Sequence, residues 1–250
     1  MASQDAWSLG FQPLRTTPEH YEVVAEGGMV RFSRTENGIA SVMEVFVSET
    51  SDVEIRRITL TNQTNTPRSL RLTSYAEVVL NTRMGDVGHP AFSKLFVQTE
   101  WDTARGALLA NRRLRSPSDD PGYMAHWIFE QRPDAWESDR MRFVGRGRTR
   151  ENTLALGQAL SCTTGNVLDA VFSLQKNLKL GAGESVTLHV ALAFATNLET
   201  LNKWMAESIP KKPAKEPALF SKDELEMIAM FQSKSNKNGV INLPVVTIPQ

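Results

Sequence analysis

The chain has 250 residues and a mass of 27.9 kDa, and its 28 basic residues are balanced by 28 acidic residues. Hydrophobic residues make up 41% and charged residues 22%, which is typical of a soluble globular protein that buries a core without disulfides or metals. Because the net charge is zero, the whole chain is not attracted to nucleic acid or to an anionic membrane, and we expect neither as a partner.

The N-terminus and the cysteine content indicate a compartment. The first five residues carry neither the basic region nor the apolar stretch of a signal peptide, and no apolar run approaches the roughly 18 residues of a membrane span. Cys162 is the only cysteine, so no intrachain disulfide can form. We therefore expect a cytoplasmic protein without membrane insertion.

Short β-rich runs separated by turn residues dominate the chain up to about position 195. Turn composition occurs at 26–28, at 62–67 and at 181–184. Helical patterns of 10–15 residues between the runs are missing, which argues against a parallel α/β fold. The pattern predicts an all-β protein built as a large antiparallel two-sheet sandwich, with runs at 21–25, 29–33, 38–47, 53–61, 70–80, 94–99, 107–110, 123–130, 171–180 and 185–195.

The run 70–80 shows the alternation of a half-buried strand. Leu72, Ser74 and Ala76 share one parity, whereas Tyr75 and Glu77 share the other. Successive side chains of a strand point to opposite faces of the sheet. We predict that Tyr75 and Glu77 lie on the face opposite Leu72.

The last fifty residues differ from the rest. Asn197 is a candidate cap for a short helix that Pro210 ends, 211–217 has linker composition, and Ser221 with Glu224 resembles a capping box for a helix near 222–231. The β-like tail at 240–248 either returns to the sandwich as an edge strand or is loose. We expect a β-sandwich at 1–196, a helical segment with linker at 197–232, and a tail at 233–250.

Motifs for metal, cofactor or serine chemistry are missing from the sequence. The histidines 20, 89, 126 and 189 are scattered without the spacing of zinc ligands. The GxG at 145–147 has no strand–helix unit or third glycine around it, and there is no GxSxG elbow. We predict no metal, no cofactor and no catalytic residue in the isolated chain.

An arginine-rich stretch is the most unusual feature. Residues 139–150 hold five arginines within twelve positions, with acidic neighbours at 137, 139 and 151. The planar guanidinium suits carboxylates, phosphates and paired sugar hydroxyls. The stretch is either a solvated loop with ion pairs or a loop that contacts an anion or a saccharide. Nucleic-acid binding is the weakest alternative, because no wider basic stripe accompanies it.

Aromatic and acidic residues give a second indication of sugar contact. Trp101, Tyr123, Trp127 and Trp136 occur in the middle of the chain, and sugars stack on such rings, although each Trp also suits a core. Trp127 alternates with His126, so one of the two faces the core. Asp120 lies in an Asp-Asp-Pro-Gly sequence that is typical of a turn but also suits contact with a polar ligand.

Several long motifs resemble a known family. The chain from about residue 7 to 195, about three quarters of its length, resembles the N-terminal sandwich module of the glycoside phosphorylases, which include cellobiose and chitobiose phosphorylases, and most of all that of the cyclic β-1,2-glucan synthases. The motifs are DVEIRRITLTN (52–62), LTSYAEV (72–78), HPAFSKLFVQTE (89–100), RRLRSP (112–117), DRMRFVGRGR (139–148) and GNVLDAVFSL (165–174).

The resemblance implies a β-supersandwich of the mutarotase-like kind. In the family this module precedes a helical linker and an (α/α)₆ barrel that carries the catalytic acid and the phosphate site. Because 250 residues do not include such a barrel, the isolated chain is expected to be inactive as an enzyme. The phosphorylases act as homodimers, in which a loop of the sandwich offers an arginine to the sugar in the partner's active site.

The resemblance places that loop on the arginine-rich stretch. We expect Arg140 or Arg142 to be tied to Asp139 or Glu137, Phe143 to anchor the loop in the sandwich, and Arg146 and Arg148 to be exposed. The predicted substrate-binding residues are Arg146, Arg148, Arg140, Trp127 and Asp120.

We predict a non-catalytic, carbohydrate-binding sandwich module that binds β-glucan or an oligosaccharide. Two alternatives remain open at this point: a fragment of a glycosyltransferase or phosphorylase that is active only with a barrel-containing partner domain, or a structural module for oligomerisation such as homodimer formation.

Overall fold

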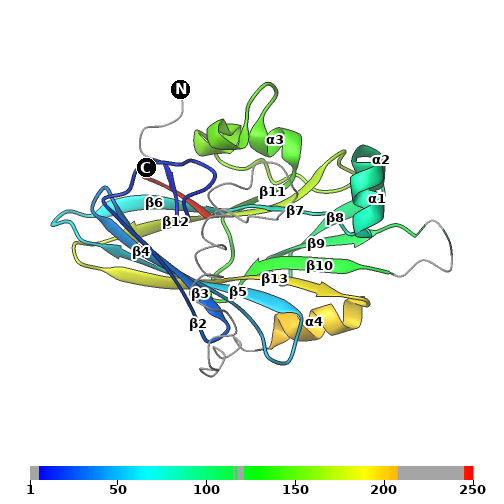
Figure 1. Ribbon diagram of the computed structural model, residues 1–250, viewed down its shortest axis with the longest axis horizontal. Helices are drawn as coiled ribbons and strands as arrows, with labels where there is room; N and C mark the ends of the chain where they lie inside the picture. The colour runs from blue at the N-terminus through cyan, green and yellow to red at the C-terminus, as the bar shows by residue number, and fades with distance from the viewer. Residues whose placement is uncertain (1–5, 115, 117–120, 208–244, 250) are drawn as a thin grey trace.

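The computed structural model describes residues 6–114, 116, 121–207 and 245–249, the last range by its backbone. Two antiparallel sheets face each other and form the body of the molecule (Figure 1). One has the strand order β1-β14-β6-β12-β11, with β7 paired to β12, and the other has the order β2-β3-β4-β5-β13-β10-β9-β8. The predicted all-β, two-sheet antiparallel fold is therefore confirmed.

Most strands follow the predicted runs, but the run 70–80 is divided at Tyr75 and ends at Glu77, and no run was predicted for the strands at 7–8 and 135–139. The six-stranded sheet contains β1 (Trp7–Ser8), β6 (Arg68–Ser74), β7 (Ala76–Glu77), β11 (Ala135–Asp139), β12 (Ala170–Leu180) and β14 (Val245–Pro249). The eight-stranded sheet contains β2 (His20–Glu26), β3 (Met29–Glu36), β4 (Ile39–Val47), β5 (Val53–Asn62), β8 (Val97–Asp102), β9 (Ala107–Arg112), β10 (Tyr123–Ile128) and β13 (Ser185–Ala195). In the tail, β14 pairs with β6 and β1.

Asn62 joins two of the connections that cross between the sheets. The turn after β5 leads to β6, and the turn after β12 leads to β13, so both change sheets. The buried Asn62 amide donates to the carbonyls of Thr66 (2.8 Å), Leu180 (3.2 Å) and Gly181 (2.8 Å). Because one side chain satisfies carbonyls of both connections, Asn62 holds this end of the sandwich together.

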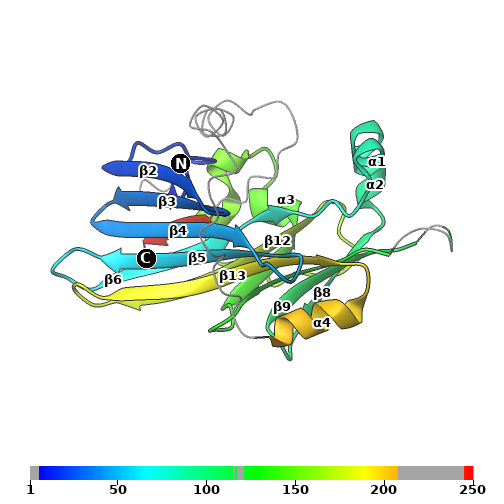
Figure 2. The same ribbon diagram turned by 60° about the horizontal axis from the view of Figure 1, so that its bottom comes forward.

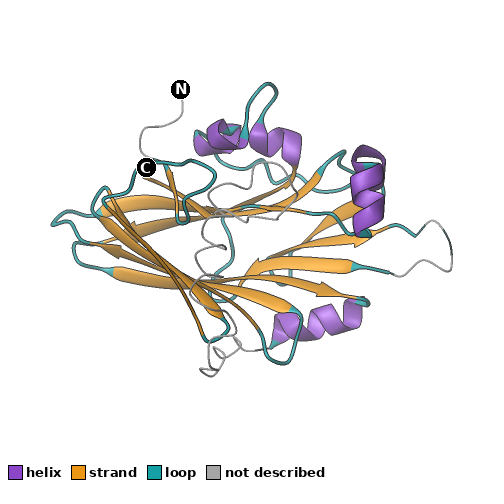
Figure 3. Cartoon of the chain, viewed as in Figure 1, coloured by secondary structure: helices purple, strands orange, loops and turns teal. Residues whose placement is uncertain are grey.

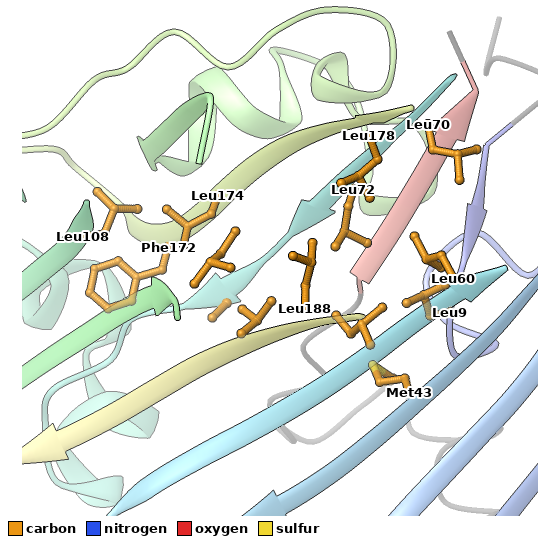
Figure 4. Close-up of a cluster of buried hydrophobic side chains, with 14 of the residues drawn as sticks. Leu9, Met43, Leu60, Leu70, Leu72, Leu108, Phe172, Leu174, Leu178 and Leu188 are labelled. Carbon is orange, nitrogen blue, oxygen red and sulfur yellow. The ribbon is translucent and has the colours of Figure 1, made fainter. Parts of the chain in front are cut away.

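The main core lies between the sheets. Leucines and a phenylalanine of β6 and β12 meet apolar side chains of β5 and β13, as Figure 4 shows for Leu72, Phe172, Leu60 and Leu188. The alternation predicted for 70–80 is confirmed: Leu72 points into this core, whereas Tyr75 packs in a separate cluster on the other side of the sheet. The prediction that this strand is half-buried is wrong for Tyr75, which is 4% exposed, because helix α3 (Arg140–Val144) covers it.

A second cluster lies on the outer face of the eight-stranded sheet. Helix α4 (Leu198–Ala206) covers this face and buries Leu201 (Figure 2). Its predicted cap is confirmed, since the Asn197 side chain accepts a hydrogen bond from Thr200 N at 2.8 Å. The described helix ends at Ala206, before Pro210, which is outside the described residues, as are the predicted linker at 211–217 and the predicted helix near 222–231.

Three short α-helices and two 3-10 helices, at Arg150–Asn152 and Leu154–Leu156, precede α4 in the chain. The α-helices lie on the periphery of the sandwich (Figure 3). They are α1 (Arg83–Gly88), α2 (Pro90–Lys94) and α3 (Arg140–Val144). The run predicted as a strand at 94–99 is wrong at its start, because Lys94 ends α2 and β8 begins at Val97. Helices of five or six residues are too short to show an amphipathic period, so the sequence pattern did not reveal them. No helix in the described ranges is both long and apolar enough to span a membrane.

Candidate functional site

Helix α3 lies over the outer face of the six-stranded sheet (Figure 1). The rest of the arginine-rich stretch, residues 145–150, follows its C-terminal end and is called the arginine loop below. Asp139 caps it, because its carboxylate accepts a hydrogen bond from Met141 N at 2.8 Å. The chain leaves the helix through Gly145 and Gly147, which have φ values of +90° and +71°. Such φ values favour glycine, so these two positions allow the sharp turn that projects Arg146.

Arg140 is tied to the sheet by charged neighbours. Its Nε lies 3.4 Å from Glu77 Oε1 and 3.8 Å from Asp169 Oδ2. Asp169 also accepts from Lys94 Nζ at 2.7 Å, so one carboxylate links α2 and α3. Burial by itself lowers the pKa of the Arg140 guanidinium, but the neighbouring Tyr75, Glu77 and Asp169 together raise it above its ordinary value.

Of the two acidic partners expected for Arg140 or Arg142, the structure pairs Asp139 with Arg142 but not Glu137 with either arginine. Glu137 is buried, and its carboxylate accepts from the backbone N–H groups of Ser138 (3.0 Å) and Asp139 (2.9 Å) and from the Ser161 hydroxyl. Its expected ion pair with Arg140 or Arg142 is therefore wrong, because these local donors already occupy it. Arg142 Nε lies 3.9 Å from Asp139 Oδ2, a long surface contact.

Phe143 anchors the loop in the apolar cluster under α3. Its side chain is 6% exposed, and its ring centroid lies 4.6 Å from that of Tyr75. Val144, Leu160 and Val171 complete the surroundings. Burial, followed by the charge of Glu77, raises the pKa of the Tyr75 phenol, which therefore stays neutral and packs as an aromatic ring.

Arg146 and Arg148 are exposed beyond this anchor. Within the described part of the chain, neither side chain forms an ion pair or a hydrogen bond. The stem of Arg148 packs over Gly145, where an added Cβ would lie 3.1 Å from Arg148 Cδ. The arrangement presents two guanidinium groups on a backbone held by α3, with donors available to an anion or to sugar hydroxyls.

Trp127 does not belong to this site. Its indole is 3% exposed and packs among apolar residues of the outer cluster, with the Phe129 ring at 5.3 Å. The alternation of Trp127 with His126 predicts that only one of the two faces a core, but both are buried, because α4 covers the outer face of β10. A buried indole has no free face for a sugar, so we remove Trp127 from the candidate site. Asp120 lies outside the described residues.

Two other tryptophans stack on each other at the edges of the sheets. The Trp101 and Trp136 ring centroids are 3.8 Å apart and the ring planes differ by 6°. Trp101 comes from β8 and Trp136 from β11, so the stack joins an edge strand of each sheet. Each ring thus covers one face of the other, and the pair contributes to closing the sandwich.

A buried histidine inside the sandwich forms hydrogen bonds that the sequence pattern does not predict. His126 Nδ1 lies 2.7 Å from the Ala191 carbonyl, which can only accept, so Nδ1 carries the proton. Nε2 then accepts from the Ser74 hydroxyl at 2.7 Å, and Ser74 Oγ accepts from Leu174 N at 3.0 Å. Burial lowers the pKa of His126 to about 4, so it is neutral near pH 7.

The hydrogen-bonded pair of His126 and Ser74 is a structural link between the sheets and not a catalytic dyad. His126 and Ser74 are 3% and 6% exposed, and the small cleft beside them, which Glu54 and Arg56 also line, has room for about one water molecule. A substrate therefore does not reach the hydroxyl. A histidine in the otherwise apolar run Met124–Ile128 was the signal for such a bond. No group of three or more metal-ligating side chains occurs in the described ranges.

Comparisons with known proteins agree with this architecture. The family model "Glycosyl hydrolase 94, supersandwich domain" matches residues 1–209. The cyclic beta-(1,2)-glucan synthase NdvB of Rhizobium meliloti (strain 1021) is 34% identical over 190 residues, 74% of this chain and 7% of that protein. Solabiose phosphorylase of Paenibacillus borealis is 25% identical over 199 residues, 78% of this chain and 25% of that protein.

Among solved structures, a polysaccharide lyase aligns with 75% of this chain and 24% of its own, at a TM-score of 0.47 and 14% identity. The chain spans only 7% of the length of the synthase and about a quarter of the length of the phosphorylase.

Proposed function

The chain belongs to the glycosyl hydrolase 94 supersandwich domain family, and from this membership we propose that it is a non-catalytic, carbohydrate-binding module for β-glucan or related oligosaccharides. The observation that carries the proposal is the exposed pair Arg146 and Arg148 on a loop anchored by Phe143. The names of the relatives, a glucan synthase and a disaccharide phosphorylase, supply the class of ligand.

The chemistry of the loop suits this ligand. Each guanidinium offers five N–H donors in a planar fork, which fits two neighbouring hydroxyl oxygens of a sugar. Arg140, whose charge is balanced by Glu77 and Asp169, holds the start of the loop and is not free to bind in the same way. We therefore assign Arg146 and Arg148 to ligand contact and Arg140 to positioning.

Titration calorimetry with β-1,2-linked gluco-oligosaccharides tests the proposal. A charge-assisted hydrogen bond contributes about 1.5–3 kcal/mol, so we expect Arg146→Ala to weaken binding by roughly tenfold to a hundredfold. Its unfolding free energy is expected to change by less than about 0.5 kcal/mol, as for most surface substitutions. Arg105→Ala is the matched control, because Arg105 is an exposed arginine in another loop, paired with Asp102 at 2.6 Å.

The outcomes separate binding from structure. If titration of the unchanged chain with a series of β-glucan oligosaccharides gives no heat of binding, carbohydrate binding is contradicted. Equal affinity of Arg146→Ala and the control would remove Arg146 from the site. An Arg146→Ala chain that unfolds would show that the loop is structural.

A second candidate function follows from how little of each relative's length this chain covers. Because the chain covers 7% to 26% of the curated relatives, we propose as the alternative that it works with a barrel-containing partner domain and contributes to catalysis only there. We expect the isolated chain to release no sugar phosphate from β-glucan and phosphate. Activity of the chain alone would contradict the proposal of a non-catalytic module, and activity that appears only on mixing with a barrel domain would favour the alternative.

A further inference from the structure

A second loop, residues 10–16 in the connection from β1 to β2, lies close to the arginine loop. Figures 1 and 2 show this connection next to the two 3-10 helices at 150–152 and 154–156. Leu14 of loop 10–16 packs with Leu156 and Ala6 in a small apolar cluster. The fold therefore brings a segment from the start of the chain to the candidate site.

A buried arginine holds loop 10–16 in place. Arg34 of β3 is 1% exposed, and its guanidinium donates to the carbonyls of Gly10 at 3.4 Å and Thr16 at 3.0 Å. Within the loop, Arg15 N donates to the Phe11 carbonyl at 3.0 Å. These bonds fix both ends of the loop and the backbone of Arg15, so the exposed Arg15 side chain has a defined support.

Glu151, directly after the arginine loop, interacts with arginines of both loops. A hydrogen bond from the Thr149 side chain is the largest cause that lowers the pKa of the Glu151 carboxyl, and the charges of Arg15 and Arg150 add to it, although burial opposes them. The carboxylate is therefore ionised near pH 7. Since one carboxylate interacts with Arg15 and Arg150, the two loops are coupled by charge as well as by the contact of Leu14.

Together the two segments carry an excess of positive charge. Loop 10–16 contains Arg15, and residues 145–151 contain Arg146, Arg148 and Arg150, whereas Glu151 is the only acidic residue of either segment. Four positive charges against one negative charge leave a net charge of +3, although the whole chain has none. All four arginines are exposed. Such a local excess of one sign attracts a ligand of the opposite sign.

We propose that loop 10–16 and the arginine loop form one binding site for saccharides that carry a carboxylate, in which Arg15 determines specificity. The inference rests on the proposed function, from which it takes the saccharide, and it adds the charge of the ligand and a residue of a second loop. A guanidinium binds a carboxylate through two parallel hydrogen bonds, each about twice as strong as a bond between neutral groups. A neutral glucan leaves the excess charge unmatched, so the site prefers the acidic saccharide.

A nucleic acid is the other common polyanion, and the charge distribution does not favour it. Nucleic-acid binding needs basic side chains that follow the phosphate backbone, usually on a domain with a clear positive charge. Here the basic residues come from two short segments of a chain without net charge. A single-stranded oligonucleotide therefore serves as the competing ligand in the test.

Titration calorimetry of the full chain compares two ligands that differ only in charge. One is a β-1,2-linked gluco-oligosaccharide of defined length, and the other is the same oligosaccharide with C6 oxidised to a carboxylate. In about 20 mM salt, we expect the oxidised form to bind at least about tenfold more tightly, since exposed charges are little screened there. In about 500 mM salt, this advantage is expected to fall below about threefold.

Arg15→Gln removes one positive charge and keeps a polar side chain. We expect it to weaken binding of the oxidised saccharide at least about fivefold, and binding of the neutral saccharide by a smaller factor. Arg105→Gln is the matched control, because Arg105 is exposed in another loop, and it is expected to leave both affinities unchanged. If Arg15→Gln does not fold, Arg150→Gln replaces it, since Arg150 interacts with the same carboxylate.

The outcomes separate this inference from the proposed function. Equal affinity for the two saccharides in about 20 mM salt would overturn the inference and leave the proposed function in place. Binding of neither saccharide would contradict both. An Arg15→Gln chain that keeps the full preference for the oxidised form would overturn the role of Arg15. If an oligonucleotide of equal charge binds as tightly as the oxidised saccharide, the site recognises charge alone, and the inference is overturned.

Discussion

Replacing Phe143 with alanine separates the anchor of the arginine loop from its ligand contacts. The side chain is 6% exposed and packs against Tyr75 at 4.6 Å between ring centroids. Removal of a buried phenylalanine costs about 3–5 kcal/mol, because apolar burial is lost and a cavity remains. For a chain of this size each kcal/mol lowers the melting temperature by about 2–4 °C. We expect Phe143→Ala to lower it by about 6–20 °C.

Two readouts follow the Phe143→Ala variant. Thermal unfolding by near-ultraviolet circular dichroism reports the loss of stability, and hydrogen exchange of the amides at 140–148 reports release of the loop. Met141→Ala is the control on the same helix, because Met141 is 60% exposed, and we expect it to change the melting temperature by less than about 2 °C. A Phe143→Ala variant that melts within about 1 °C of the unchanged chain and keeps slow exchange would refute the anchor.

Two further substitutions concern the interior. Asn62→Ala removes the amide that donates to the carbonyls of Leu180 and Gly181, and urea titration is expected to show that the free energy of unfolding falls by about 3 kcal/mol. A fall of less than about 1 kcal/mol would contradict this role of Asn62. For the buried His126, whose pKa is lowered to about 4 from about 6.5 in the unfolded chain, the unfolded state binds the proton first as the pH falls. The stability that it contributes above about pH 6.5 is therefore lost progressively down to about pH 4, by about 3 kcal/mol. Unfolding curves measured at a series of pH values are expected to show a smaller change in unfolding free energy over this range for His126→Gln. An equal slope of unfolding free energy against pH in both proteins would contradict the assignment.

The sequence determined the class of fold because strand patterns are local. The alternation in 70–80, the turn at 26–28 and the cap at Asn197 each depend on neighbouring residues, and the structure has a strand, a hairpin and a helix at these places. The family resemblance was also carried by contiguous motifs, and the family model matches the same part of the chain. The exposure of Arg146 and Arg148 followed from the glycines and from the apolar Phe143 beside them.

The tertiary structure decided which side chains are buried and which charged groups pair. Trp127 is a core residue only because α4, about seventy positions later, covers the outer face of β10. Glu77 and Asp169, which hold Arg140, are distant in sequence, so a local search chose the neighbouring carboxylates of Asp139 and Glu137 instead. The bond between His126 and Ser74 joins two sheets in the same way. Periodicity tells which residues share a face of a strand, but the layer that covers that face comes from a remote segment, and for that reason burial and ion-pair partners emerged only from the folded chain.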